Sequence, residues 1–243
     1  MGRRFGMRRT PSSIILKWLS VGIAFAVASP ATHANLIFFG NIDNVPGGVG
    51  NSQTILSLQS PGSATVETGG VGIVSGAEAR FGDALAGANT PLPLRTISSA
   101  GIQNASDIVI YLDAQEPGND NLITIDRLTL NIFGPSGNNN LLFSASLASV
   151  PLANLVTCPG QGNNCINAFI LDSSQAALAQ QSFNGANRIG LEGSLSAATG
   201  GPDRFFLSDR EDVGIPPQKI PEPASLALLG LALVGLRVAG RRL

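Results

Sequence analysis

Short apolar or alternating runs recur through the middle of the chain, and stretches rich in glycine, proline and asparagine separate them. The most pronounced runs are "DIVIYLD" at 107–113 and "LITIDRLTLNIF" at 122–133, which "EPGNDN" and "GPSGNNN" follow. Many short strands with this punctuation predict a mostly β fold, an antiparallel β-sandwich or jelly-roll-like domain with one or two short helices. Strands are expected at 35–39, 54–58, 64–67, 71–74, 107–113, 122–133, 141–147, 167–172, 188–195 and 204–208.

The apolar period slips once within the run at 122–133. Ile123 and Ile125 share one phase, whereas Leu128 and Ile132 share the other. Both halves can face the core only if one extra residue is accommodated at Asp126–Arg127, which predicts a β-bulge. A break into two strands is the alternative.

One helix is predicted in "DSSQAALAQQSFNG" at 172–185. Asp172 or Ser173 is available as the N-cap, the interior is built of Ala, Leu and Gln, and Asn184–Gly185 would end the helix. A second short helical turn is predicted in "ARFGDALAGA" at 79–88.

The start of the chain has the layout of a secretory signal peptide. Basic residues precede an uncharged, mostly apolar run, "WLSVGIAFAVAS" at 18–29, and "PATHA" ends at Ala34. This order predicts an N-terminal signal helix that is cleaved between Ala34 and Asn35. The run is shorter than the roughly 20 residues of a bilayer span. An uncleaved N-terminal anchor is the alternative.

A second apolar run lies near the C-terminus, in "PEPASLALLGLALVGLRVAGRRL" at 221–243. Pro221 and Pro223 cannot join a helix interior or a central strand, so they hold Glu222 in an extended backbone. The run at 224–236 predicts a short transmembrane helix, and the basic residues after it are expected on the cytoplasmic side.

This tail resembles the PEP-CTERM sorting signal of Gram-negative bacteria. The resemblance implies that exosortase, an integral-membrane enzyme, recognises Pro221, Glu222 and Pro223 and processes the tail, and that Arg241 and Arg242 act as the stop. It also implies export, with a transient stay in the inner membrane before the protein reaches the cell surface or the extracellular space. An ordinary C-terminal anchor is the alternative.

Four segments follow from these patterns. They are a signal peptide at 1–34, a β-sandwich ectodomain at 35–212, a proline-containing and exposed linker at 213–220, and the sorting signal at 221–243.

Residues 35–218 hold fifteen acidic residues against six arginines, a net charge near −9. A body this acidic repels phosphates, so no nucleic-acid partner is expected. Cys158 and Cys165 are a close pair in an exported chain, which predicts a disulfide.

The body offers few groups for catalysis. Residues 35–218 contain no histidine and no lysine, which excludes the Ser–His–Asp, Cys–His and Ser–Lys arrangements. No Walker, Rossmann or HExxH motif is present. The sequence therefore predicts a protein that is not an enzyme and has no catalytic residue.

Two segments carry candidate binding residues. The carboxylates of "DAQEPGNDNLITID" are oxygen ligands of the kind that Ca²⁺ takes, and the alternative is a solvated hairpin turn. In "ATGGPDRFFLSDRED" at 198–212, charged residues alternate with phenylalanines. That segment is interpreted as a final edge strand with paired charges, or as a binding rim. The candidate calcium ligands are Asp113, Glu116, Asp120 and Asp126.

The function expected from the sequence is a non-enzymatic surface or extracellular-matrix protein that is sorted through its C-terminal signal. The alternative is an extracellular glycan-binding module or a carboxylate-dependent hydrolase that acts on exopolysaccharide.

Overall fold

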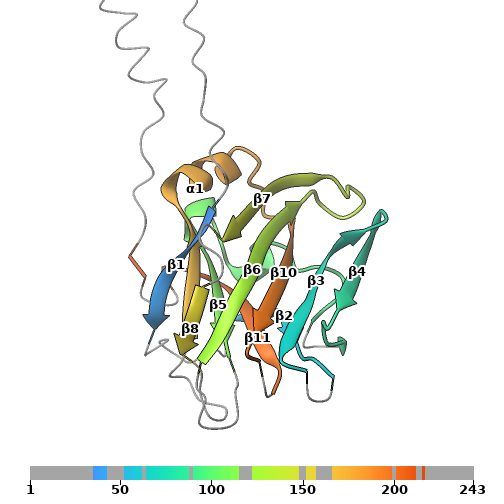
Figure 1. The fold of residues 1–243 in the computed structure, drawn as a ribbon. Helices are drawn as coiled ribbons and strands as arrows, with labels where there is room; N and C mark the ends of the chain where they lie inside the picture. The colour runs from blue at the N-terminus through green and yellow to red at the C-terminus, as the bar shows by residue number, and fades with distance from the viewer. Residues whose placement is uncertain are drawn as a thin grey trace, which may run out of the picture. The chain divides into compact units, whose positions relative to one another are not determined.

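A computed structural model describes residues 35–42, 52–61, 64–87, 90–114, 122–147, 152–156, 166–198, 201–211 and 215–216 (Figure 1). These residues are mostly β, as predicted. The predicted signal helix and C-terminal transmembrane helix lie outside them. Within the described ranges, no helix has the length and apolar character needed to cross a bilayer.

The strands join in one sheet, in the order β2-β11-β5-β9-β1-β7-β6-β10-β3-β4, and β8 pairs with the first part of β6. All ten predicted strands are found, two of them as parts of β3, whereas β4 and β8 were not predicted. The strands are β1 (Asn35–Ile42), β2 (Gln53–Leu58), β3 (Val66–Val74), β4 (Ala77–Gly82), β5 (Ile108–Asp113), β6 (Leu122–Phe133), β7 (Leu141–Leu147), β8 (Leu152–Val156), β9 (Ile166–Leu171), β10 (Arg188–Ser196) and β11 (Asp203–Asp209).

The sheet curls until its two ends meet. Leu58 at the end of β2 forms an antiparallel bridge with Ala84, just after β4. The backbone nitrogen of Gln59 donates to the carbonyl oxygen of Asp83 at 3.1 Å, and that of Leu85 donates to Ser57 at 2.9 Å. Closure satisfies backbone groups that an open edge would leave exposed.

The two-sheet sandwich of the sequence prediction is not confirmed, because the described strands hydrogen-bond into a single curled sheet. Its pairings are antiparallel except between β1 and β7, where Asn35 lies opposite Ser146 and Leu36 opposite Leu147. A curled sheet and a sandwich bury the same alternating strands, so the apolar pattern does not distinguish them.

The main hydrophobic core takes alternate residues from most strands, among them Ile110, Leu130 and Phe205. β5 and β9 are buried on both faces, because the intervening residues of these strands pack in a second cluster. The second cluster consists of Val109, Tyr111, Ile166, Ala168, Ile170, Phe206 and Ile215.

The predicted bulge in β6 is confirmed. Arg127 pairs with Ser194 of β10 and Ile125 with Leu195, so Asp126 is the extra residue on β6. Ile125 and Leu128 on either side of it are both fully buried. The bulge therefore keeps both halves of the strand facing the main core.

The helix α1 (Ser173–Gln180) begins as predicted. Asp172 is its N-cap, and its side chain accepts a hydrogen bond from the backbone nitrogen of Gln175 at 2.8 Å. The helix ends four residues before Asn184. Two 3-10 helices, η3 (Ser98–Ala100) and η4 (Ala105–Asp107), were not predicted.

The helical turn predicted at 79–88 is wrong over its first part, since residues 79–84 are the end of β4 and the turn after it, whereas Gly87 has 3-10 conformation. Ser75 and Gly76 have φ angles of 51° and 80°, which form a tight two-residue hairpin turn after β3. Pairing with β3 then outweighs the helical preference of the alanines, which Gly82 and Gly87 weaken.

Candidate functional site

The chain that follows β11 folds back onto the body. The backbone nitrogen of Ile215 donates to the carbonyl oxygen of Arg210 at 3.2 Å. The guanidinium of Arg210 donates from Nη1 to the carbonyl oxygen of Pro216 at 3.0 Å. Ile215 is only 3% exposed, so the expectation of an exposed linker at 213–220 is wrong at this residue, whereas Pro216 is exposed and the other linker residues are not described. We call Arg210, Ile215 and Pro216 the C-terminal dock.

Ile215 lies against the second hydrophobic cluster, with Tyr111 of β5 and Phe206 of β11 among its members. Ile215 of the C-terminal segment therefore packs with the side chains of β5 and β11 that point away from the main core. Removing an isoleucine side chain from water contributes about 1.5–3 kcal/mol. The C-terminal dock thus combines a hydrophobic contact with two hydrogen bonds to backbone carbonyl oxygens, those of Arg210 and Pro216.

Arg210 is buried beside η4. Its backbone nitrogen donates to the carbonyl oxygen of Asp107 at 3.0 Å. Burial lowers the pKa of the Arg210 guanidinium, and the negative charge of Asp107 acts in the opposite direction. The Asp107 carboxylate is oriented by Asn104, whose Nδ2 donates at 2.8 Å, and by the Ser106 hydroxyl at 3.1 Å. The Arg210 guanidinium thus holds Pro216 through one hydrogen bond, near a carboxylate that η4 orients.

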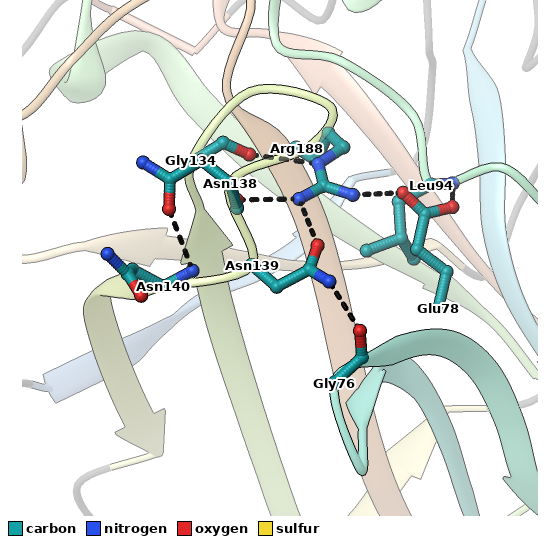
Figure 2. Close-up of polar contacts among 8 residues, drawn as sticks. All are labelled: Gly76, Glu78, Leu94, Gly134, Asn138, Asn139, Asn140 and Arg188. Carbon is teal, nitrogen blue, oxygen red and sulfur yellow. Dashed lines mark hydrogen bonds and ion pairs between the residues drawn. The ribbon is translucent and has the colours of Figure 1, made fainter.

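A second buried arginine, Arg188, connects loops at one end of the sheet (Figure 2). It forms an ion pair with Glu78 of β4, and its Nε donates to the carbonyl oxygen of Gly134 at 2.9 Å. Its Nη2 donates to the backbone oxygen of Asn138 and to the side-chain oxygen of Asn139, at 2.8 and 2.9 Å. Each guanidinium nitrogen donates to a protein acceptor, so this network stabilises the fold.

The candidate calcium ligands are only partly described. Glu116 and Asp120 lie outside the described residues. Asp113 is the last residue of β5 and lies opposite Arg204 of β11, while Asp126 is the bulge residue of β6. Across the described part of the chain, no three histidine, cysteine, aspartate or glutamate side chains gather as a metal site would require. The calcium site stays a prediction.

Neither interpretation of the segment at 198–212 is correct for β11. The strand pairs with β2 on one side and β5 on the other, so it is not an edge strand. Phe205 and Phe206 are 0% and 6% exposed, one in each hydrophobic cluster, so they cannot form a binding rim. Asp203 is also fully buried.

The remaining predicted residues belong mostly to segments that are not described. Ala34, Cys158, Cys165, Pro221, Glu222, Pro223, Arg241 and Arg242 lie outside the described residues, so the disulfide and the sorting residues stay predictions. Asn35, on the other side of the predicted cleavage site, is the first residue of β1. Its carbonyl oxygen accepts a hydrogen bond from the backbone nitrogen of Asp172 at 3.4 Å.

Comparison with known proteins bears on the C-terminal segment. Residues 219–242 match the PEP-CTERM protein-sorting motif. The chain carries a PEP-CTERM sorting signal. No curated protein and no solved structure matches the chain.

The PEP-CTERM signal makes this an exported protein that is sorted to the cell envelope or surface by exosortase. The matched region begins at Lys219, three positions after Pro216 of the C-terminal dock. The PEP-CTERM signal thus follows the folded body almost directly. The sequence prediction found the signal from its three parts but missed the dock, because "VGIPP" has no periodicity that would mark Ile215 as buried.

Proposed function

We propose that this protein is a non-enzymatic surface or extracellular-matrix component of a Gram-negative bacterium. The observation that carries the proposal is the PEP-CTERM signal at residues 219–242. The protein is exported, stays transiently in the inner membrane, and is passed by exosortase to the surface or the medium. An acidic body with fifteen acidic residues against six arginines suits a soluble exterior component.

The roles of two buried arginines support a non-enzymatic body. Arg188 and Glu78 pair with each other and with backbone groups, and Arg210 binds the chain end. Proton transfer or nucleophilic attack needs a group with a free face toward a substrate. With no histidine or lysine in residues 35–218, the chain has few residues of that kind.

Fractionation of the native host tests the proposal. We expect the mature protein in the surface or extracellular fraction, and a deletion strain whose matrix composition or cohesion is altered. Complementation with wild-type protein should restore the matrix. A deletion strain with an unchanged matrix would contradict the proposed role.

Incubation of the purified exported protein with host exopolysaccharide, with and without Ca²⁺, separates this role from the alternative. We expect no cleavage of the polysaccharide. Cleavage, or specific binding that Asp113→Ala and Asp120→Ala abolish, would instead establish the glycan-directed activity. Glu211→Ala, which changes an exposed acidic residue of the body, is the matched control.

A further inference from the structure

We propose that the folded body itself presents the sorting signal, with Ile215 and Arg210 as the positioning residues. The inference rests on sorting through the PEP-CTERM signal and adds a role for the body in that reaction. In this arrangement the sorting enzyme meets the signal within a short tether of the dock, instead of at the end of a long free stalk.

The first argument is the short distance along the chain between the dock and the signal. Pro216, which accepts the hydrogen bond from Arg210, precedes Pro221 by five positions. Five residues span at most about 18 Å when fully extended. The Pro-Glu-Pro sequence must therefore lie within that distance of the docked residue, whatever conformation the intervening chain adopts.

The second argument is that the dock is built from both side-chain and backbone contacts. Ile215 joins the second hydrophobic cluster, and its backbone nitrogen is hydrogen-bonded to Arg210. Arg210 in turn is attached to η4 through Asp107. A linker without a function in positioning has no need of a buried isoleucine and a buried arginine, since a polar, flexible sequence would connect the two parts equally well.

The third argument is entropic. A segment that is already ordered loses less conformational freedom when an enzyme binds it, so it binds more readily than a free chain of the same sequence. The dock and the two consecutive prolines, Pro216 and Pro217, both reduce this freedom just before the signal.

The test compares the processing rates of full-length variants in the native host, followed by pulse-chase and by mass spectrometry of the C-terminus. Ile215→Asp should undock the segment, whereas Ile215→Val keeps an apolar side chain and is the matched control. We expect processing of Ile215→Asp to slow about three- to tenfold, the factor for reordering one or two side chains. Ile215→Val should be processed at the wild-type rate.

A Gly/Ser insertion after Gln218 keeps the test decisive if Ile215→Asp does not fold. The insertion leaves the dock and the body unchanged but separates the signal from them. We expect slower processing here as well. Processing of the insertion variant at the wild-type rate or faster would overturn the proposal. Processing of Ile215→Asp at the wild-type rate would overturn it as well, provided that the variant is folded and its residues 210–218 have become protease-sensitive.

Glu222→Ala in the same strain separates failure of the proposal from failure of sorting. If Glu222→Ala is processed normally, recognition through Glu222 is wrong, and the Ile215→Asp and insertion variants alone decide the positioning role. If Glu222→Ala blocks processing while the Ile215→Asp and insertion variants are processed at the wild-type rate, sorting holds and the positioning role is wrong.

Discussion

Arg188 forms an ion pair with Glu78 across 110 positions of sequence, from the start of β10 to β4. Glu78 also accepts a hydrogen bond from the backbone nitrogen of Leu94 at 2.7 Å through its second carboxylate oxygen. The pair therefore connects β4, β10, the segment at Leu94 and the loop between β6 and β7 (Figure 2). An ion pair with this many backbone partners fixes the end of the sheet.

Arg188→Ala should destabilise the protein by about 3 kcal/mol, because it removes the buried partner of Glu78 and leaves the carbonyl oxygen of the buried Gly134 without its donor. Urea unfolding of the purified protein measures this change. Glu78→Gln is the comparison, since its amide oxygen still accepts from either partner, and it should cost less. Equal losses of stability for the two variants would show that the charge of Glu78, and not the hydrogen bonds donated by Arg188, contributes most of the stabilisation.

Two glycines of β10 provide a matched pair. A Cβ at Gly190 would lie 2.6 Å from the carbonyl oxygen of Val71 and 2.8 Å from the Phe133 ring. Gly190→Ala should therefore cost about 1–3 kcal/mol by overpacking. A Cβ at Gly193 would meet only side-chain atoms, the nearest at 3.3 Å on Leu58. Gly193→Ala should lie close to wild type, and thermal unfolding distinguishes the two.

The bulge in β6 makes a prediction about deletions. Removing Asp126 restores an unbroken alternation, so that Ile125 and Leu128 remain on the same face of the strand. Removing Thr129 instead moves one half of the strand to the wrong face. We expect the protein lacking Asp126 to fold and the protein lacking Thr129 not to fold, as judged by circular dichroism. Folding of both would mean that the register of β6 is not fixed by its apolar residues.

The N-cap of α1 gives a local test. Asp172→Ala removes the acceptor for the backbone nitrogen of Gln175 and should cost about 1 kcal/mol. Gln181→Ala changes an exposed residue at the other end of the helix and should have little effect. The difference in unfolding midpoint between the two variants measures the contribution of the cap.

Glu222→Ala should leave export intact but leave the precursor in the inner membrane. Glu222 is the only charge between two prolines in the sorting signal, and a recognition site that pairs with it loses that interaction. Membrane fractionation and mass spectrometry of the C-terminus report the result. Glu211→Ala, an exposed acidic residue of the body, is the control. Normal processing of Glu222→Ala would argue against this role of the glutamate.

The sequence by itself determined features whose signal is contained in a short stretch of chain. The period of two placed Ile123, Ile125 and Leu128 on the core side and located the bulge at Asp126–Arg127, where Asp126 is the extra residue. The capping residues before an alanine-rich run located the start of α1 at Asp172 or Ser173, and Asp172 is the N-cap. The sorting signal was also recognisable, since its parts follow one another directly in the sequence.

Only the tertiary structure decided how the strands are ordered and which isolated residues are buried. The closure of the sheet through Leu58 and Ala84, and the place of β11 between β2 and β5, depend on pairings between distant segments. Arg188 and Ile215 have no periodic neighbours that would mark them as buried, because their partners come from other parts of the chain. Local periodicity records which face of a strand meets the core, but it carries no information about which strand lies beside it.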